Sequence, residues 1–136
     1  MNIVVDTNIL ISALIKEGLT RDLIVNSQFN LLIPEFELIE IQNHKQEIIG
    51  KSGLSEEEFK GLLSYLLNYV KAIRTEEIIN YRRRAKEIME EIDPDDVQFI
   101  AAAIAYNAAI WSDDTHFQKQ NVVKVFTTEE MIEPQK

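Results

Sequence analysis

Short apolar segments recur along the 136-residue chain, and polar or turn-forming residues bound each of them. They lie at residues 3–5, 31–33, 109–111 and 122–126. Each is mostly apolar without strict alternation, which is typical of strands that are buried on both faces of a parallel sheet. The pattern therefore predicts four buried strands.

Helical patterns lie between these strands, at residues 20–27, 35–50, 55–71, 75–91 and 94–107, and a last short helix begins near residue 127. Several carry start signals. Pro34 suits the first position of a helix, and Thr75 is an N-cap candidate. Two pairs have the spacing of a capping box, Ser55 with Glu58 and Thr127 with Glu130. The alternation of strands with helices predicts an α/β fold around a parallel sheet. Residues 55–91 form the exception, because we expect no strand there and predict an inserted helical hairpin.

Composition narrows the class of protein. The chain is 46% hydrophobic and 27% charged, and its length is that of one domain, which we place at residues 1–136. No apolar run approaches the roughly 18 residues of a membrane helix, and we expect neither a signal peptide nor a membrane partner. The absence of cysteine excludes disulfides and thiolate chemistry, which is compatible with a cytoplasmic protein.

The net charge of −9, from 23 acidic and 14 basic side chains, argues by itself against a nucleic-acid partner. Carboxylates also gather divalent cations, however, and the basic side chains are clustered. Arg82, Arg83 and Arg84 with Lys86 form the densest cluster, which is equally consistent with phosphate binding and with a solvated helix face paired with nearby glutamates.

Acidic residues follow the predicted strands. Asp6 ends the first strand, Glu40 lies in the helix after the second, Asp95 and Asp96 begin a helix, and Asp114 follows the third strand. A parallel sheet brings its carboxyl ends to one edge. Several carboxylates at close range do not all stay ionised without a cation, and their hard oxygens suit Mg²⁺ or Mn²⁺. Such an ion lowers the pKa of a coordinated water and binds phosphodiesters, so we predict a metal-dependent site.

Each acidic motif, taken alone, is also explained by a structural role that involves neither metal binding nor catalysis. Asp93, Pro94 and the two aspartates after them make a favourable helix start. Glu40 alone suits a solvated helix, and Asp113 with Asp114 suits a cap. Only the placement of all of them at one edge of the sheet favours a site.

These motifs, in this order, resemble those of the PIN domain, the fold of many ribonucleases and of VapC-type toxins of toxin–antitoxin modules. The matching stretches are VVDTNIL with Asp6, LLIPEFELIEI with Pro34 and Glu40, DDVQFIAAA with Asp96, Ala101 and Ala103, and IWSDDTHF with Ser112, Asp114 and Phe117. Together they cover nearly the whole chain.

The resemblance implies a three-layer α/β/α sandwich with a sheet of four or five strands, and a ribonuclease that uses Mg²⁺ or Mn²⁺. It gives the acidic roles to Asp6, Glu40, Asp96 and Asp114. It further implies RNA as substrate, a homodimer and an antitoxin partner.

The resemblance also assigns supporting roles by position. Thr7 would supply a hydroxyl hydrogen bond, Asn8 would fix the turn, and Ser112 stands where threonine is commoner. Residues one apart at a helix start point about 100° apart, so we favour Asp96 over Asp95 as the ligand and expect Asp113 to face solvent.

Further polar residues are candidates for substrate contacts or for the surroundings of the metal. His44 lies one helical turn after Glu40, and His116 closely follows Asp114; both also suit an ordinary surface. An apolar stripe at residues 62, 63, 66, 67 and 70 fits either core packing or a dimer or antitoxin surface.

Two other functions compete with a nuclease. A non-catalytic PIN-like module that binds RNA or protein would keep the fold without metal binding. A phosphohydrolase with an aspartate nucleophile, of the haloacid-dehalogenase class, requires Asp-x-Asp after the first strand, where this chain has Asn8.

Overall fold

The computed structural model describes residues 1–89 and 91–132. Its core is a five-stranded sheet in the order β3-β2-β1-β4-β5, and every pair of neighbouring strands is parallel. The strands are β1 (Asn2–Val5), β2 (Asn30–Pro34), β3 (Val70–Ile73), β4 (Ala109–Trp111) and β5 (Val125–Phe126). The predicted α/β fold with a parallel sheet is confirmed.

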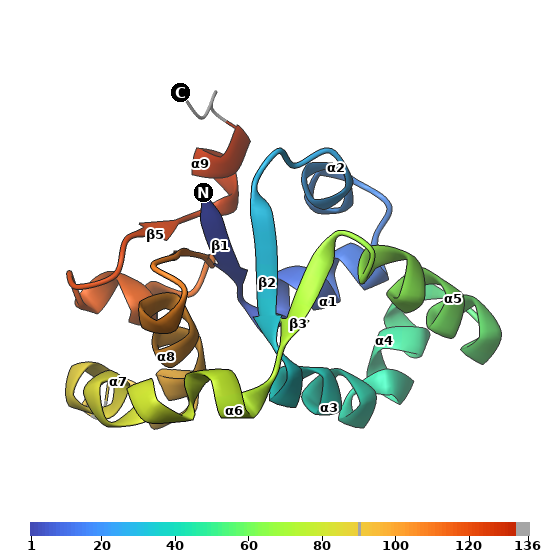
Figure 1. Ribbon diagram of the computed structural model, residues 1–136. Coiled ribbons are helices and arrows are strands. Elements are labelled where there is room, and N and C mark those ends of the chain that lie inside the picture. The colour runs from blue at the N-terminus through green and yellow to red at the C-terminus, as the bar shows by residue number, and fades with distance from the viewer. Residues whose placement is uncertain (90, 133–136) are drawn as a thin grey trace.

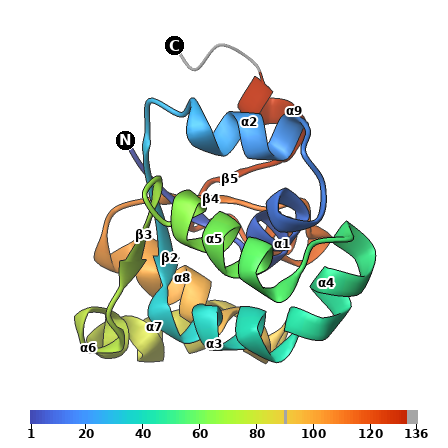
Figure 2. The ribbon, with the colours of Figure 1, turned by 90° about the vertical axis from the view of Figure 1, so that its right-hand side faces the viewer.

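Helices cover both faces of the sheet and complete three layers (Figure 1). The first layer contains α1 (Thr7–Ile15), α2 (Leu19–Val25), α3 (Glu35–Asn43), α4 (Lys45–Ser52) and α5 (Glu56–Leu66), with α9 (Thr128–Ile132) beside it. The second contains α6 (Thr75–Ile78), α7 (Arg82–Met89) and α8 (Val97–Ala105). Short 3₁₀ turns are η1 (Ile79–Tyr81), η2 (Pro94–Asp96) and η3 (Thr115–Lys119). Figure 2 shows α3, α4 and α5 in front of the sheet.

Alternate residues of each central strand belong to two separate cores. In β1, Ile3 and Val5 pack with the first layer, whereas Val4 packs with the second. Leu32 of β2 and Ile110 of β4 likewise face the second layer. Both faces of the sheet are therefore buried at these strands, which explains why the strands are apolar on both sides.

The predicted helical hairpin at residues 55–91 is wrong, because β3 lies between α5 and α6 and pairs with β2 from Leu31–Val70 to Pro34–Ile73. Val70 and Ile73 are buried, while Lys71 is exposed on this edge strand. An edge strand with one exposed lysine lacks the continuous apolar run that marks a central strand. Backbone pairing with β2 decides its conformation.

Other boundaries also differ from the prediction. Helix α1 was not predicted, the helix expected at 35–50 is divided at His44 into α3 and α4, and the helix expected at 75–91 is divided into α6, η1 and α7. Both capping boxes are confirmed. Ser55 Oγ accepts from the Glu58 N–H at 3.1 Å while Glu58 accepts from the Ser55 N–H, and Thr127 and Glu130 do the same.

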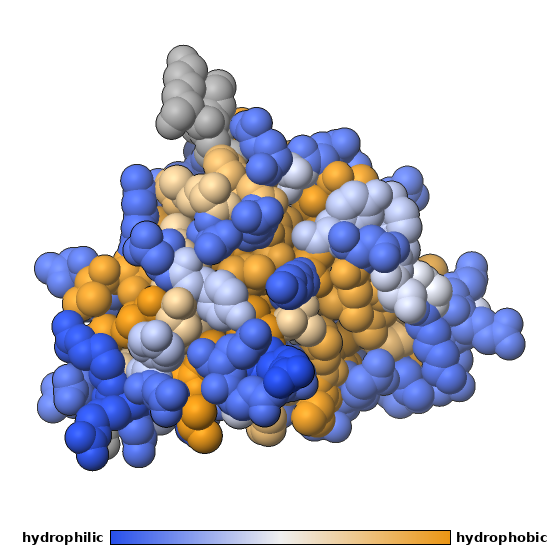
Figure 3. Space-filling model, in the orientation of Figure 1, coloured by the Kyte–Doolittle hydropathy of each residue, from blue (hydrophilic) through white to orange (hydrophobic). Residues whose placement is uncertain are grey.

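On the face seen in Figure 3, hydrophobic residues reach the surface in the middle and again at the left, with hydrophilic residues between and around them. Within the described ranges, none of the helices combines the length and the apolar character needed to cross a membrane.

Candidate functional site

The carboxyl ends of β1 and β4 lie side by side and bring two of the predicted acidic motifs together. Val5 pairs with Trp111, and the backbone N–H of Asp6 donates to the Trp111 carbonyl at 3.0 Å. The next residue on β4 is Ser112, and Asp114 follows two positions later. Parallel pairing of two buried strands therefore places Asp6 next to the Ser112–Asp114 turn.

The hydroxyl of Ser112 forms hydrogen bonds with both Asp6 and Asp114 at this edge of the sheet. Ser112 Oγ donates to Asp6 Oδ2 at 2.7 Å and accepts from the backbone N–H of Asp114 at 2.9 Å. Ser112 is fully buried, and Asp6 is 5% exposed. The backbone N–H of Asn8 donates a longer bond, 3.4 Å, to Asp6 Oδ1. Ser112 thus couples the positions of Asp6 and Asp114.

Burial is the main cause that raises the pKa of Asp6, and the negative charge of Asp114 raises it further. The hydrogen bonds from Ser112 and Asn8 act in the opposite direction because they favour the ionised carboxylate. Asp6 is therefore a buried carboxylate whose ionised form is disfavoured. A bound cation would stabilise that ionised form.

Asp96 enters the same region from η2, at the start of α8. Asp93 caps this turn, since its Oδ1 accepts from the Asp95 N–H at 3.0 Å, and Pro94 follows it as predicted for a helix start. Asp96 is 8% exposed, whereas Asp95 is exposed. The two neighbours therefore differ in burial, and the choice of Asp96 over Asp95 as a metal ligand stays a prediction.

The environment of Asp96 is the most strongly perturbed at this edge. Burial raises the pKa of Asp96 to about 7, with further contributions from the negative charges of Asp93, Asp6 and Asp114, while His116 lowers it. Its Oδ2 atom is buried and has no hydrogen-bond partner among the described residues. Asp6, Asp96 and Asp114, which we call the acidic cluster, therefore interact electrostatically with one another.

A third buried carboxylate, Glu37, comes from α3, whereas Asp114 is half-buried. Glu37 is 8% exposed, and its Oε2 accepts a hydrogen bond from Thr7 Oγ1 at 3.0 Å. Burial raises its pKa, and the charges of Glu40 and Asp6 add to this effect. Thr7 thus makes the hydroxyl bond expected of it, with Glu37 as its acceptor.

Glu40 is half-buried one helical turn beyond Glu37, and the charges of the two carboxylates interact. Sequence reasoning did not single out Glu37 because the family spacing from Pro34 selects Glu40. The sequence did contain a signal for Glu37, because it lies three residues before Glu40 and this spacing puts both glutamates on one face of a helix. Whether Glu40 binds a metal stays a prediction.

His116 contacts several of these aspartates at once. Its Nδ1 atom lies 2.9 Å from Asp93 Oδ2, 3.3 Å from Asp114 Oδ1 and 3.8 Å from Asp96 Oδ2. Asp93, Asp96 and His116 each offer one ligand atom within 4.8 Å of the others. The helix-start pattern predicts only a capping role for Asp93, and the fold additionally places its carboxylate beside His116.

The remaining candidate residues from the sequence lie outside the acidic cluster. His44 is an exposed residue at the junction of α3 and α4, 3.6 Å from Glu47. Arg82, Arg83 and Arg84 are exposed on α7. Asp113 is exposed as predicted, and both of its carboxylate oxygens accept bonds from Thr128 at 2.7 Å, which ties it to the start of α9.

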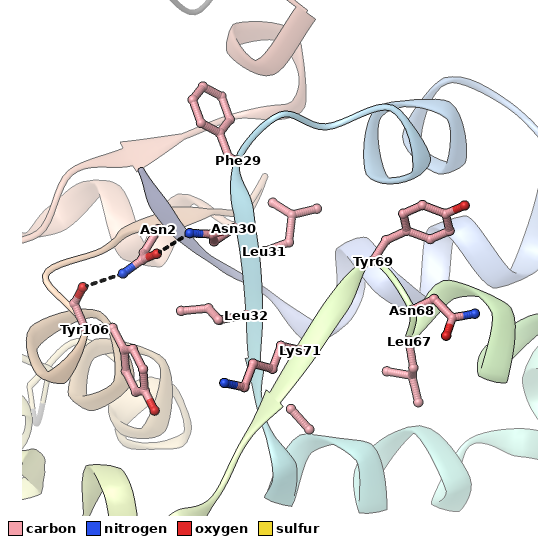
Figure 4. Close-up of a pocket in the computed structure, with 11 residues that line it drawn as sticks. Asn2, Phe29, Asn30, Leu31, Leu32, Leu67, Asn68, Tyr69, Lys71 and Tyr106 are labelled. Carbon is pink, nitrogen blue, oxygen red and sulfur yellow. Dashed lines mark hydrogen bonds between the residues drawn. The ribbon is translucent and has the colours of Figure 1, made fainter.

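A separate hollow of about 790 Å³ lies near the amino ends of β1 and β2 (Figure 4). Asn2 and Asn30 line it with Lys71 and Tyr106, and the Asn2 side chain links the Asn30 amide to the Tyr106 carbonyl. The acidic cluster lies at the carboxyl ends of the strands. The hollow therefore does not belong to the acidic site.

The family model described as PIN domain matches residues 4–135. The chain belongs to the PIN-domain family. This family is one of nucleases, and the match spans β1, α3, α8 and β4, which together carry or precede the buried carboxylates described above. No curated protein sequence matches the chain significantly.

Among solved structures, the chain is similar to one in the crystal structure of VapBC2 from Rickettsia felis bound to a DNA fragment from the promoter. The TM-score is 0.73 at 19% sequence identity, and the alignment covers 93% of this chain and 98% of the other. This similarity confirms the PIN fold across almost the entire length of both chains.

Proposed function

We propose that this PIN-domain protein is a metal-dependent endoribonuclease, and that it acts as the toxin of a toxin–antitoxin pair. The observation that carries the proposal is the acidic cluster, in which the buried Asp96 Oδ2 faces other carboxylates without a hydrogen-bond partner among the described residues. Family membership supports the nuclease assignment. The RNA substrate and the choice of ion are our inference.

The residues present fit a divalent cation. Asp6, Asp96 and Asp114 supply hard oxygen donors whose mutual repulsion and desolvation disfavour their charged forms. We infer that these three would hold Mg²⁺ or Mn²⁺, with Glu37 and Glu40 beside them. When bound, such an ion activates water and stabilises negative charge on a phosphodiester.

The chain's own residues hold the carboxylates in place for this role. Ser112 orients Asp6 through the 2.7 Å bond and fixes the Asp114 backbone through the 2.9 Å bond. Thr7 orients Glu37 from the first turn of α1. Ser112 is fully buried and most of Asp6 is out of water, so the geometry is set before substrate arrives, which is the condition for electrostatic stabilisation of a transition state.

A basic surface on α7 suits the RNA backbone. Arg82, Arg83 and Lys86 line a hollow of about 580 Å³ together with Ile79 and Glu87. Arg84 instead lies 3.6 Å from Glu87. Phosphate contacts by exposed cations give salt-dependent, sequence-independent affinity, so we assign Arg82, Arg83 and Lys86 to general RNA binding.

The assignment as a toxin rests on the structural neighbour, which was crystallised as VapBC2 with promoter DNA. We extend an antitoxin partner to this chain by analogy of fold. A homodimer is the assembly that the family resemblance leads us to expect, and sedimentation equilibrium measures it directly.

The test is cleavage of an end-labelled, mixed-sequence RNA with Mg²⁺ or Mn²⁺ and with EDTA. Asp6→Asn and Asp114→Asn remove charge from the acidic cluster, and we expect each to abolish metal-dependent cleavage. Asp113→Asn is the matched control, because it removes the same charge from the adjacent exposed residue and keeps an acceptor for Thr128. It should cleave like the unmodified protein.

Equal cleavage by Asp6→Asn and the unmodified protein would contradict the proposal and indicate a contaminant. RNA binding without cleavage under any metal condition would favour the non-catalytic module instead.

A further inference from the structure

We propose that Asp93, Asp96 and His116 form a cation subsite with mixed nitrogen and oxygen donors, and that His116 makes it prefer Mn²⁺ and other transition-metal ions to Mg²⁺. The inference deepens the proposed function, since Asp96 also belongs to the acidic cluster. It adds two residues, Asp93 and His116, as ligands.

The distances between donor atoms suit one ion. His116 Nδ1 lies 2.9 Å from Asp93 Oδ2 and 3.8 Å from Asp96 Oδ2. An ion with ligands at about 2.1 Å in octahedral geometry separates adjacent donors by roughly 3 Å and opposite donors by roughly 4 Å. The Asp93 and Asp96 donors lie within 4.8 Å of each other, so the three donors reach a common ion after their side chains adjust.

Two donor atoms in this group are buried and unsatisfied. Asp96 Oδ2 and His116 Nδ1 have no hydrogen-bond partner among the residues that the structure describes, and Asp96 as a whole is only 8% exposed. His116 Nδ1 approaches Asp93 closely without the geometry of a hydrogen bond. Buried polar atoms without partners are costly, and an ion shared by these donors removes that cost.

Other contacts hold each ligand so that the relevant atom stays available. Asp93 uses Oδ1 to cap the Asp95 N–H, which leaves Oδ2 for the ion. The backbone N–H of His116 donates to Asp114 Oδ1 at 2.9 Å. The next residue, Phe117, is fully buried and packs edge-on against Phe99 of α8, with ring centroids 6.0 Å apart. The η3 turn and the start of α8 are therefore joined beside the subsite.

The donor set determines the preferred metal. Mg²⁺ is a hard ion that takes oxygen ligands and keeps much of its water, whereas imidazole nitrogen suits Zn²⁺, Ni²⁺, Cu²⁺ and iron. Mn²⁺ accepts carboxylate oxygen and, as a transition-metal ion, also accepts nitrogen. One imidazole with two carboxylates should thus raise affinity for transition-metal ions over that for Mg²⁺.

The decisive measurement is the pulsed electron paramagnetic resonance spectrum of Mn²⁺ bound to the whole protein, in which a coordinated imidazole gives ¹⁴N modulation. The chain has two histidines, so His44→Asn, at the exposed α3–α4 junction, is the matched control for His116→Asn. We expect ¹⁴N modulation in the unmodified protein and in His44→Asn, and none in His116→Asn.

Calorimetric titration with Mn²⁺ and with Mg²⁺ adds a second readout. His116→Asn should weaken Mn²⁺ binding by about tenfold or more and leave Mg²⁺ affinity within about threefold. Asp93→Asn should weaken Mn²⁺ binding as well, whereas Asp95→Asn should not.

Three results would overturn the subsite: bound Mn²⁺ without ¹⁴N modulation, Mn²⁺ affinity unchanged in His116→Asn, or no Mn²⁺ binding at millimolar concentration. The outcome is separable from that of the proposed function. An absence of RNA cleavage with intact ¹⁴N modulation would refute the nuclease and leave the subsite standing, and cleavage without ¹⁴N modulation would do the reverse.

Discussion

Replacement of Asp96 by asparagine should stabilise the metal-free protein at neutral and alkaline pH, although it removes a residue of the acidic cluster. Burial and the charges of Asp93, Asp6 and Asp114 raise the pKa of Asp96 from 3.8 to about 7, with His116 acting in the opposite direction. The ionised carboxylate is therefore less favourable in the folded chain than in the unfolded chain. Asparagine has a similar shape without the charge.

The magnitude follows from the pKa. Between pH 3.8 and about 7, the folded chain keeps a proton that the unfolded chain has released, so the free energy of unfolding falls as the pH rises through this window. Each pH unit corresponds to about 1.4 kcal/mol, which gives a full cost of up to about 4 kcal/mol above pH 7. Solvent relaxation reduces this value, and we expect Asp96→Asn to gain about 2–4 kcal/mol at pH 8 and less than half as much at pH 5.

Urea denaturation in EDTA at both pH values measures this gain. Asp95→Asn is the control, because it removes the same charge from the exposed neighbour and should change the free energy of unfolding by at most about 0.5 kcal/mol. The reasoning fails if Asp96→Asn is less stable than the unmodified protein at pH 8. It also fails if the difference in the free energy of unfolding between the two proteins is the same at pH 5 and at pH 8.

Three further predictions concern substitutions of single residues, and urea denaturation measures the change in the free energy of unfolding for each. Ser112→Ala should lower the free energy of unfolding by about 2 kcal/mol, since the bond to the Asp6 carboxylate is lost; an unchanged value would mean that this bond is not formed. Ser55→Ala removes the N-cap of α5 and should cost about 1 kcal/mol, whereas Ser64→Ala, exposed within the same helix, should not destabilise. Gly53→Ala should cost about 1 kcal/mol because φ is +76° there, while Gly61→Ala inside α5 should stabilise by about 0.5 kcal/mol, and equal signs would contradict this argument.

Strand prediction succeeded for three central strands that are buried on both faces. The segment expected at 122–126 also forms a strand, but this is the short edge strand β5, which is half-buried, so its predicted burial is wrong. Strands β1, β2 and β4 are apolar at every central position because alternate residues pack into two different cores. Prediction failed for β3, whose exposed Lys71 interrupts the apolar run, and for α1, whose apolar residues directly follow β1 after the polar Asp6–Asn8 turn. Edge pairing and amphipathic packing are decided by neighbours that are distant in the sequence.

Local signals such as apolar runs, proline and capping residues were enough to predict that Asp6 and Asp114 follow strands and that Asp96 begins a helix. The identity of the buried carboxylates and of the interacting charges follows from the three-dimensional packing. That packing placed Glu37 rather than Glu40 against Thr7, and it brought Asp93 beside His116. Burial and electrostatic coupling depend on packing between segments that are far apart in the chain, and no local pattern encodes that packing.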